Sequence, residues 1–113
     1  MAADCLFCRI VAGEIPATRV AESEQCIAFR DIGPQAPTHV LVIPRTHVAS
    51  LDQLASGELG GAILLMAASV ARSEGIAESG YRVVFNTNEH GGQTVHHLHA
   101  HVLGGRAMRW PPG

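Results

Sequence analysis

The sequence contains no lysine, and all eight of its basic residues are arginine. Charged residues make up only 16% of the chain, and the formal net charge is −2. A chain with this balance lacks the basic surface with which proteins bind duplex nucleic acid, so we expect no nucleic-acid partner. No apolar run approaches the roughly 18 residues that a membrane-spanning helix needs, so we expect no membrane association either.

The start of the chain lacks the pattern of a secretory leader. No basic segment followed by an apolar run occurs there, so we expect no signal peptide. Cysteine is scarce, because only three are present, and two of them form the pair Cys5 and Cys8. In a reducing compartment such a CxxC pair indicates metal or redox chemistry more than a structural disulfide. These features predict a cytoplasmic protein.

Repeats, low-complexity tracts and linkers are also missing. The chain has 113 residues, a usual length for one domain. Hydrophobic residues make up 47% of it, which is typical of a globular protein with one core. We therefore expect residues 1–113 to form a single domain.

Hydrophobic periodicity and turn residues predict an α+β fold. A short helix is expected over residues 4–12, with Asp4 as its N-cap and Gly13 as its stop. A long helix is expected over residues 56–76, where apolar side chains recur at spacings of three and four. Strands are predicted at residues 18–22, 25–30, 38–43, 81–86 and 95–103. Strands on both sides of one main helix favour an antiparallel sheet of about five strands, with the almost wholly apolar strand 38–43 at its centre.

The last predicted strand carries three histidines at alternate positions, His97, His99 and His101. Side chains alternate between the faces of a strand, so the three are expected on one face, roughly 6.5–7 Å apart. That spacing suits a central histidine that acts on a bound atom, while its neighbours serve the ligand, a metal or the backbone. An incidental patch explains the pattern less well, because clustered histidines beside a buried face cost stability unless each is satisfied.

Three chemistries remain open from the residues alone. A neutral imidazole is a good nucleophile and a proton shuttle near pH 7, which makes His99 a candidate for attack on phosphorus. Alternatively, the three imidazoles bind a catalytic zinc ion, or the domain binds a ligand without useful turnover. The loop before this strand, residues 87–94, contains Gly91 and Gly92 and allows backbone N–H groups to approach an anion closely.

Residues 95–106 contain His-x-His-x-His among apolar residues, followed by two glycines and an arginine. This segment resembles the motif of the histidine-triad (HIT) superfamily, in its Hint-like branch of nucleotide-binding proteins. The resemblance continues in the family's order through residues 31–39, 91–93 and 110–113. It implies a purine nucleoside phosphoramidase, a hydrolase that releases AMP or GMP and an amine through a covalent nucleotidyl-histidine. The alternative is a nucleotide-binding scaffold module with incidental hydrolysis.

The resemblance also implies roles for individual residues. His99 is the implied nucleophile, His101 a phosphate contact and proton donor, and His39 and His97 the histidines that fix ring orientation. Asp31 is implied to bind the ribose hydroxyls, although an aspartate before a proline-rich turn equally suits a loop cap. The other implied nucleotide contacts are Phe29 and Ile32 at the base, with Asn86, Gly92, Gln93 and Thr94 near the phosphate. On pattern alone, Phe29 and Ile32 are more typical of ordinary core residues.

A metal site is implied by a more distant resemblance. The CxxC pair occurs in some bacterial members, and the related galactose-1-phosphate uridylyltransferase uses a similar pair and two histidines to bind structural zinc. The corresponding set here is Cys5, Cys8, His47 and His97, which suits a closed tetrahedral site. The two cysteines also suit a helix as small buried residues. No metal is needed for the chemical step if His99 attacks phosphorus directly.

The resemblance to the HIT superfamily also bears on the oligomeric state and on His96. The resemblance implies a homodimer formed through the main helix and the sheet, in which Trp110 lies near the partner's site. His96 departs from the aromatic residue of animal Hint proteins, and alternation places it away from the triad, so we expect no catalytic role for it. The sequence identifies neither the physiological amine nor the preferred purine.

Overall fold

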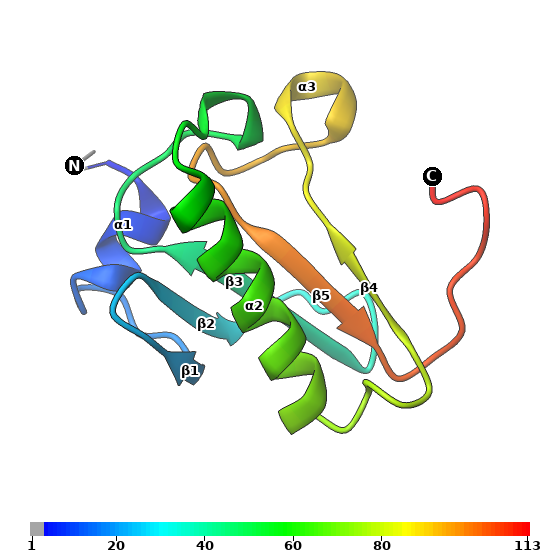
Figure 1. Cartoon of the computed structure of the whole chain (residues 1–113). Helices are drawn as coiled ribbons and strands as arrows, with labels where there is room; N and C mark the ends of the chain where they lie inside the picture. Colours follow the sequence, from blue (N-terminus) through cyan, green and yellow to red (C-terminus); the bar gives the residue numbers. More distant parts are fainter. Residues whose placement is uncertain (1–3) are drawn as a thin grey trace.

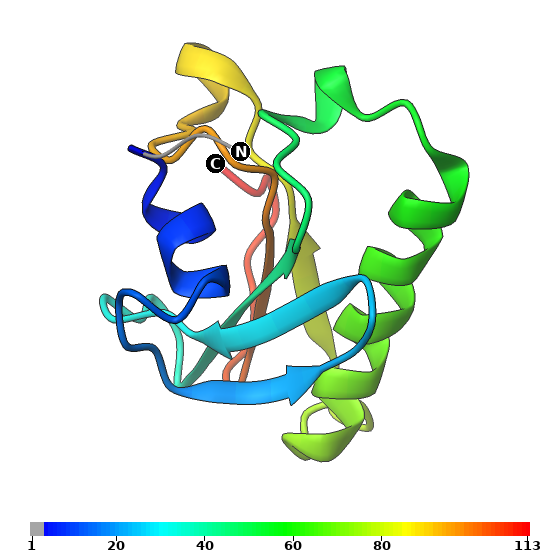
Figure 2. The ribbon, with the colours of Figure 1, turned by 90° about the vertical axis from the view of Figure 1, so that its left-hand side faces the viewer.

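The computed structural model describes residues 4–113; residues 1–3, which begin the segment where no signal peptide is expected, lie outside it. A five-stranded antiparallel sheet has the order β1-β2-β3-β5-β4, and helices cover its two faces (Figures 1 and 2). The elements are α1 (Leu6–Val11), β1 (Arg19–Glu22), β2 (Cys26–Arg30), β3 (Thr38–Pro44), η1 (Leu51–Gln53), α2 (Gly57–Ser73), β4 (Tyr81–Val84), α3 (Asn88–Gly91) and β5 (Ala100–Gly104). The predicted α+β class is confirmed.

β3 lies at the centre of the sheet, as its apolar sequence predicts. Its side chains alternate between two cores because both faces are covered. Val40 and Val42 belong to the core under α2. Leu41 and Ile43 belong to a second core under α1. In Figure 2 the sheet separates α1 from α2, so the two helices pack on opposite faces.

α2 begins where the sequence predicts and ends earlier. Ser56 is the N-cap, and its side chain accepts a hydrogen bond from the Leu59 backbone N–H. Ile63 and Val70 are buried against the sheet, in agreement with the predicted apolar face. The helix ends at Ser73, three residues before the predicted Ile76. Gly75 then adopts a φ of 75°, which reverses the chain at low steric cost.

α1 is shorter than predicted, and its N-cap is Cys5 in place of Asp4. The Cys5 sulfur accepts a hydrogen bond from the Cys8 backbone N–H at 3.4 Å, which satisfies one of the free donors of the first turn. Gly13, with a φ of 78°, lies just beyond the end of the helix, as predicted. No helix of the part of the chain that the structure describes is long and apolar enough to cross a membrane.

β5 begins at Ala100, five residues after the predicted start of this strand. The register explains the difference, because Val42 pairs with Ala100 and the next positions along β3 lead to Pro44. Proline has no backbone N–H to donate, so the ladder between β3 and β5 ends there. Residues 95–99 therefore leave the sheet, and only His101 of the three histidines belongs to the strand.

We expect Gly104→Ala to destabilise the protein by about 1–3 kcal/mol, the usual cost of overpacking a core. A Cβ at position 104 would lie 2.5 Å from Ile76 Cδ1 and 3.0 Å from Ile76 Cβ. Gly61→Ala is the control, because a Cβ there meets nothing within 4 Å and alanine favours a helix over glycine by about 1 kcal/mol. Urea unfolding checks both variants. Equal stability of Gly104→Ala and wild type would contradict this packing.

Candidate active site and metal cluster

The sheet register places two of the predicted site histidines on the face covered by α1. Leu41 pairs with His101, and Leu103 pairs with His39, so the two histidines are diagonal neighbours on adjacent strands. Diagonal neighbours on one face are close enough for long side chains to touch. The His39 Nε2 and His101 Nδ1 atoms are 2.9 Å apart.

A pocket of about 270 Å³ opens beside these histidines. Apolar side chains of α1 and β2, including Phe7, Ile10 and Phe29, line one part of it. His99, His101 and Asp31 line the polar part. The pocket thus combines an apolar slot with a cluster of imidazoles and a carboxylate, the usual composition of a small-molecule site.

His99 lies in the segment that has left the sheet, and a backbone contact fixes its ring. The His99 Nδ1 atom lies 2.7 Å from the His97 carbonyl oxygen. A carbonyl only accepts, so Nδ1 carries the hydrogen and the neutral ring keeps its lone pair on Nε2. Phe7 packs edge-on against the same ring, with centroids 5.1 Å apart. His99 therefore presents a nucleophilic nitrogen from a buried ring that two contacts orient.

His39 and His101 form a hydrogen-bonded chain, and the backbone contact of His39 determines which ring nitrogens carry the hydrogens. The Gln35 backbone N–H donates to His39 Nδ1 at 3.0 Å, so the His39 hydrogen is on Nε2. That Nε2–H donates to His101 Nδ1, which leaves the His101 hydrogen on its own Nε2. Among the described residues, His101 Nε2 is buried without a hydrogen-bond partner. A buried donor without a partner is costly, which indicates a ligand acceptor at this point of the pocket.

The pocket histidines are neutral near pH 7. Burial, and then the neighbouring His99 and His39, lower the pKa of His101 to about 4, while Asp31 acts in the opposite direction. Burial also lowers the pKa of His99 and of His39, and the Asp31 carboxylate partly opposes both shifts. A neutral His99 retains the lone pair that a nucleophile requires.

Asp31 has the loop-capping arrangement considered from the sequence, and it also lines the pocket. Its Oδ1 atom accepts from the Gly33 backbone N–H at 2.7 Å, which is the loop-capping arrangement. Its Oδ2 atom lies 3.5 Å from His39 Nε2, and the residue lines the pocket. Of the two predicted base contacts, Phe29 is buried, whereas Ile32 is fully exposed at the pocket rim.

The predicted phosphate loop is held by Gln93. Its amide Nε2 donates to the Ala49 and Val95 carbonyls, and its Oε1 accepts from the Asn88 backbone N–H. These contacts use both N–H donors of the amide, so the Gln93 side chain supports the loop, and its contact with a phosphate stays a prediction. Thr94 lines the pocket. Asn86 precedes α3 and Gly92 follows it, and neither is among the described residues that line the pocket.

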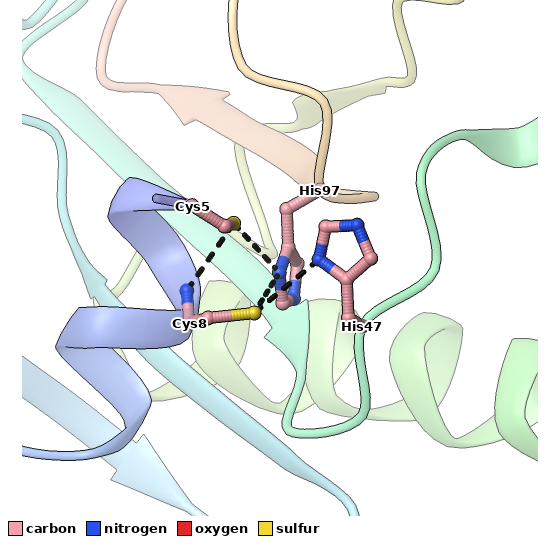
Figure 3. A group of neighbouring side chains, drawn as sticks. All are labelled: Cys5, Cys8, His47 and His97. Carbon is pink, nitrogen blue, oxygen red and sulfur yellow. Dashed lines mark hydrogen bonds between the residues drawn. The ribbon is translucent and has the colours of Figure 1, made fainter. Parts of the chain in front are cut away.

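The four predicted metal ligands come together in one cluster (Figure 3). The His97 Nδ1 atom lies 3.4 Å from Cys5 Sγ and 3.5 Å from Cys8 Sγ, and His47 Nδ1 lies 3.3 Å from Cys8 Sγ. All four ligand atoms are within 4.8 Å of one another. In a tetrahedral zinc site a sulfur and a nitrogen ligand are about 3.5 Å apart, because the bonds are about 2.3 and 2.05 Å long. The cluster therefore fits a metal of this kind.

His97 is also set up as a metal ligand by its other ring nitrogen. Its Nε2–H donates to the Pro44 carbonyl at 2.8 Å, so Nδ1 has a free lone pair directed at the cysteines. A hydrogen bond from the second nitrogen is the usual support of a metal-binding histidine. The same geometry rules out the catalytic zinc considered above, because His97 directs neither ring nitrogen toward His99 and His101.

The remaining sequence-predicted positions lie outside this cluster. His96 is exposed. Trp110 is also exposed, and the Arg82 guanidinium lies 6.0 Å from its ring centroid. Sequence reasoning missed Phe7, Gln35 and the Pro44 carbonyl. Phe7 offered a signal in the sequence, because it lies between the two cysteines. Gln35 and Pro44 offered none, because they contact the histidines through backbone atoms.

The chain is similar to known proteins over most of its length. The HIT domain family model matches residues 12–108. The chain is 44% identical to the purine nucleoside phosphoramidase of Escherichia coli over 110 residues, which cover 96% of this chain and 92% of that enzyme. It is 50% identical to an uncharacterised HIT-like protein of Synechococcus elongatus over 115 residues, with both chains fully covered. The crystal structure of a HIT family hydrolase from Legionella pneumophila has a TM-score of 0.95 and 54% identity, covering 97% of this chain and all of that one.

Proposed function

This chain belongs to the HIT family and is a hydrolase of nucleotide substrates, and we propose that it is a purine nucleoside phosphoramidase. The observation that carries the proposal is the ring of His99, whose Nδ1 is bound to the His97 carbonyl while Nε2 is left free in the pocket. The name of the Escherichia coli relative supports the substrate class. The family match over residues 12–108 supports one HIT domain.

In the proposed reaction, His99 Nε2 attacks the phosphorus of a nucleoside 5′-phosphoramidate and the P–N bond breaks. The departing nitrogen needs one proton. An anionic phosphate against His101 Nε2, with the Asp31 carboxylate beyond, favours uptake of one proton from solvent by the hydrogen-bonded His39–His101 pair. His101 gives that proton to the amine. Water then attacks the nucleotidyl-His99 phosphorus and returns a proton to His101, which releases the nucleoside monophosphate and neutral His99.

The rest of the pocket supports a purine nucleoside. Phe7, Ile10 and Phe29 offer an apolar slot to a flat base, and Asp31 is the proposed acceptor for the ribose hydroxyls. Thr94 lines the same pocket as His99 and is a proposed phosphate contact. A scaffold with incidental turnover has no need for a nucleophile whose ring two other residues orient, so the enzymatic function is the better account.

We expect wild-type protein, mixed briefly with a fluorogenic adenosine phosphoramidate and quenched without acid, to carry one nucleotidyl group on His99. His99→Ala removes the attacking atom, so the adduct is lost and kcat falls on the order of 10⁴- to 10⁶-fold. Mass spectrometry of the intact and digested protein checks the adduct.

His96→Ala is the matched control, because it removes an exposed histidine of the same segment. It is expected to keep both the adduct and turnover. If His99→Ala turns over the substrate as wild type does, covalent catalysis by His99 is wrong.

We also propose that Cys5, Cys8, His47 and His97 hold a structural zinc ion. The sulfur–nitrogen distances and the Pro44 contact of His97 support this set. Such an ion would be closed off by four protein ligands and would cross-link α1 to the chain around positions 47 and 97. The described cysteines form no disulfide, which agrees with the proposed cytoplasmic location.

Protein purified without a polyhistidine tag is expected to contain about one equivalent of zinc by elemental analysis. Cys8→Ala removes a buried ligand and should lower the content severalfold. Cys26→Ala is the control, since Cys26 is buried in the other core and lies outside the cluster. A wild-type zinc content below a tenth of an equivalent would reject the site.

We further propose a homodimer through α2 and the sheet edge. Leu64 and Leu65 of α2 are 55% and 73% exposed, and β4 is an edge strand. Apolar side chains on an outward helix face and the open backbone of an edge strand are each typical of an interface. Sedimentation is expected to show a dimer that Leu65→Glu weakens, while Leu51→Glu, on exposed η1, leaves it intact. A monomeric wild type at micromolar concentration would contradict the proposal.

A further inference from the structure

The metal cluster and the nucleophile share one residue, His97. Its Nδ1 faces Cys5 and Cys8, and its own carbonyl oxygen accepts the Nδ1–H of His99 at 2.7 Å. His97 is fully buried, and its Nε2–H is bound to Pro44. The ring of His97 therefore belongs to the cluster, while its backbone sets the tautomer of His99. A movement of the cluster is therefore transmitted to His99 through the single residue His97.

A second connection runs through α1. Cys5 and Cys8 join the cluster, and between them Phe7 packs edge-on against His99 and His97, with centroids 5.1 and 5.9 Å apart. The far end of this helix is held separately, because Arg19 donates to the Ile10 carbonyl at 2.7 Å. The near end is held by the cysteines and by burial of Phe7. The cluster thus fixes the end of α1 that contacts the nucleophile.

Among the described residues, the cluster side chains are linked to one another by hydrogen bonds in which sulfur takes part. His97 Nδ1 is an acceptor, since its hydrogen is on Nε2. A neutral Cys8 has one S–H and faces two imidazole nitrogens, His47 Nδ1 and His97 Nδ1, so it can donate to only one of them at a time. Thiols are weak hydrogen-bond donors. Four metal–ligand bonds would hold the same atoms far more firmly.

We infer that the Cys5, Cys8, His47 and His97 cluster positions the catalytic nucleophile: when it binds metal, it holds the His97 carbonyl and Phe7 against His99 and keeps the ring in the Nδ1–H tautomer. His47 and the two cysteines are then positioning residues that act through His97 and α1. This inference rests on the proposed function for its kinetic consequence. The tautomer of His99 does not depend on that function and is measured separately.

The test compares metal-loaded wild type, wild type stripped with a chelator, and His47→Gln. His47 is the variant of choice because it is only partly buried, so its replacement disturbs packing less than that of Cys8. Zinc content, folding by circular dichroism, and the ring ¹⁵N shifts of His99 are recorded for each. The rate of nucleotidyl adduct formation is measured on the same samples.

In the loaded protein, His99 is expected to show a single Nδ1–H tautomer. In the stripped protein and in His47→Gln, a mixture of tautomers is expected, with adduct formation about 10- to 100-fold slower, the usual effect of disturbing the support of a site. Added zinc should restore both properties to stripped wild type.

Cys26→Ser is the matched control for lost stability. It places a hydroxyl in the core under α2 without touching the cluster, so it should unfold more easily yet keep its zinc, the His99 tautomer and the adduct rate. A stripped, folded protein with an unchanged tautomer and rate would overturn the inference. Unfolding on stripping would also overturn it, since the metal would then maintain the fold as a whole. A metal-dependent tautomer without any adduct would retain the positioning and reject the proposed function.

Discussion

The end of the central strand at Pro44 determines how the site is built. Because this residue has no N–H, the ladder between β3 and β5 stops, and the chain before Ala100 is released from the sheet. The Pro44 carbonyl then binds the His97 ring, and the His97 carbonyl in turn binds the His99 ring. A continuous strand would have used these carbonyls in its ladder. The interrupted one uses backbone acceptors to fix two imidazoles, and only His101 is placed by the sheet itself.

Besides the end of the ladder at Pro44, the histidine site requires that its imidazoles be buried in their neutral form. A histidine taken out of water loses the solvation of its charged form, so its pKa falls and the neutral ring predominates. A neutral ring has one donor and one acceptor, and its chemistry depends on which nitrogen carries the hydrogen. Backbone groups fix the tautomer of three of these rings. The Gln35 N–H fixes that of His39. The Pro44 carbonyl fixes that of His97, and the His97 carbonyl fixes that of His99. His101 follows from His39, and its Nε2–H is the donor left for a ligand.

Much of the fold and of the residue set could be predicted from the sequence, whereas the contacts that orient the site could not. The apolar run of β3 and the period of α2 identify buried elements, because burial is a property of side chains. The CxxC pair drew attention to Cys5 and Cys8, whereas His47 and His97 joined the predicted cluster only through the family resemblance. Strand alternation, however, gave a wrong start for β5, since the competing effect was a missing N–H on the neighbouring strand. Gln93 illustrates the same limit: the sequence does not show that its amide donates to the loop carbonyls of Ala49 and Val95.

The start of α1 contributes both to the pocket wall and to the metal cluster, and this double contribution favours a catalytic function of the site over a binding function. A nucleotide pocket needs only the apolar wall of Phe7 and Ile10 and a carboxylate such as Asp31. It does not require two thiols at the start of the same short helix. Nor does it require that these thiols contact the ring of His97, the residue whose backbone carbonyl orients His99. Each of these buried polar groups carries a desolvation cost that an apolar packing would avoid. Under the proposed function, that cost is offset by a His99 ring held in one tautomer before substrate arrives, because a preoriented ring needs little reorganisation during the reaction.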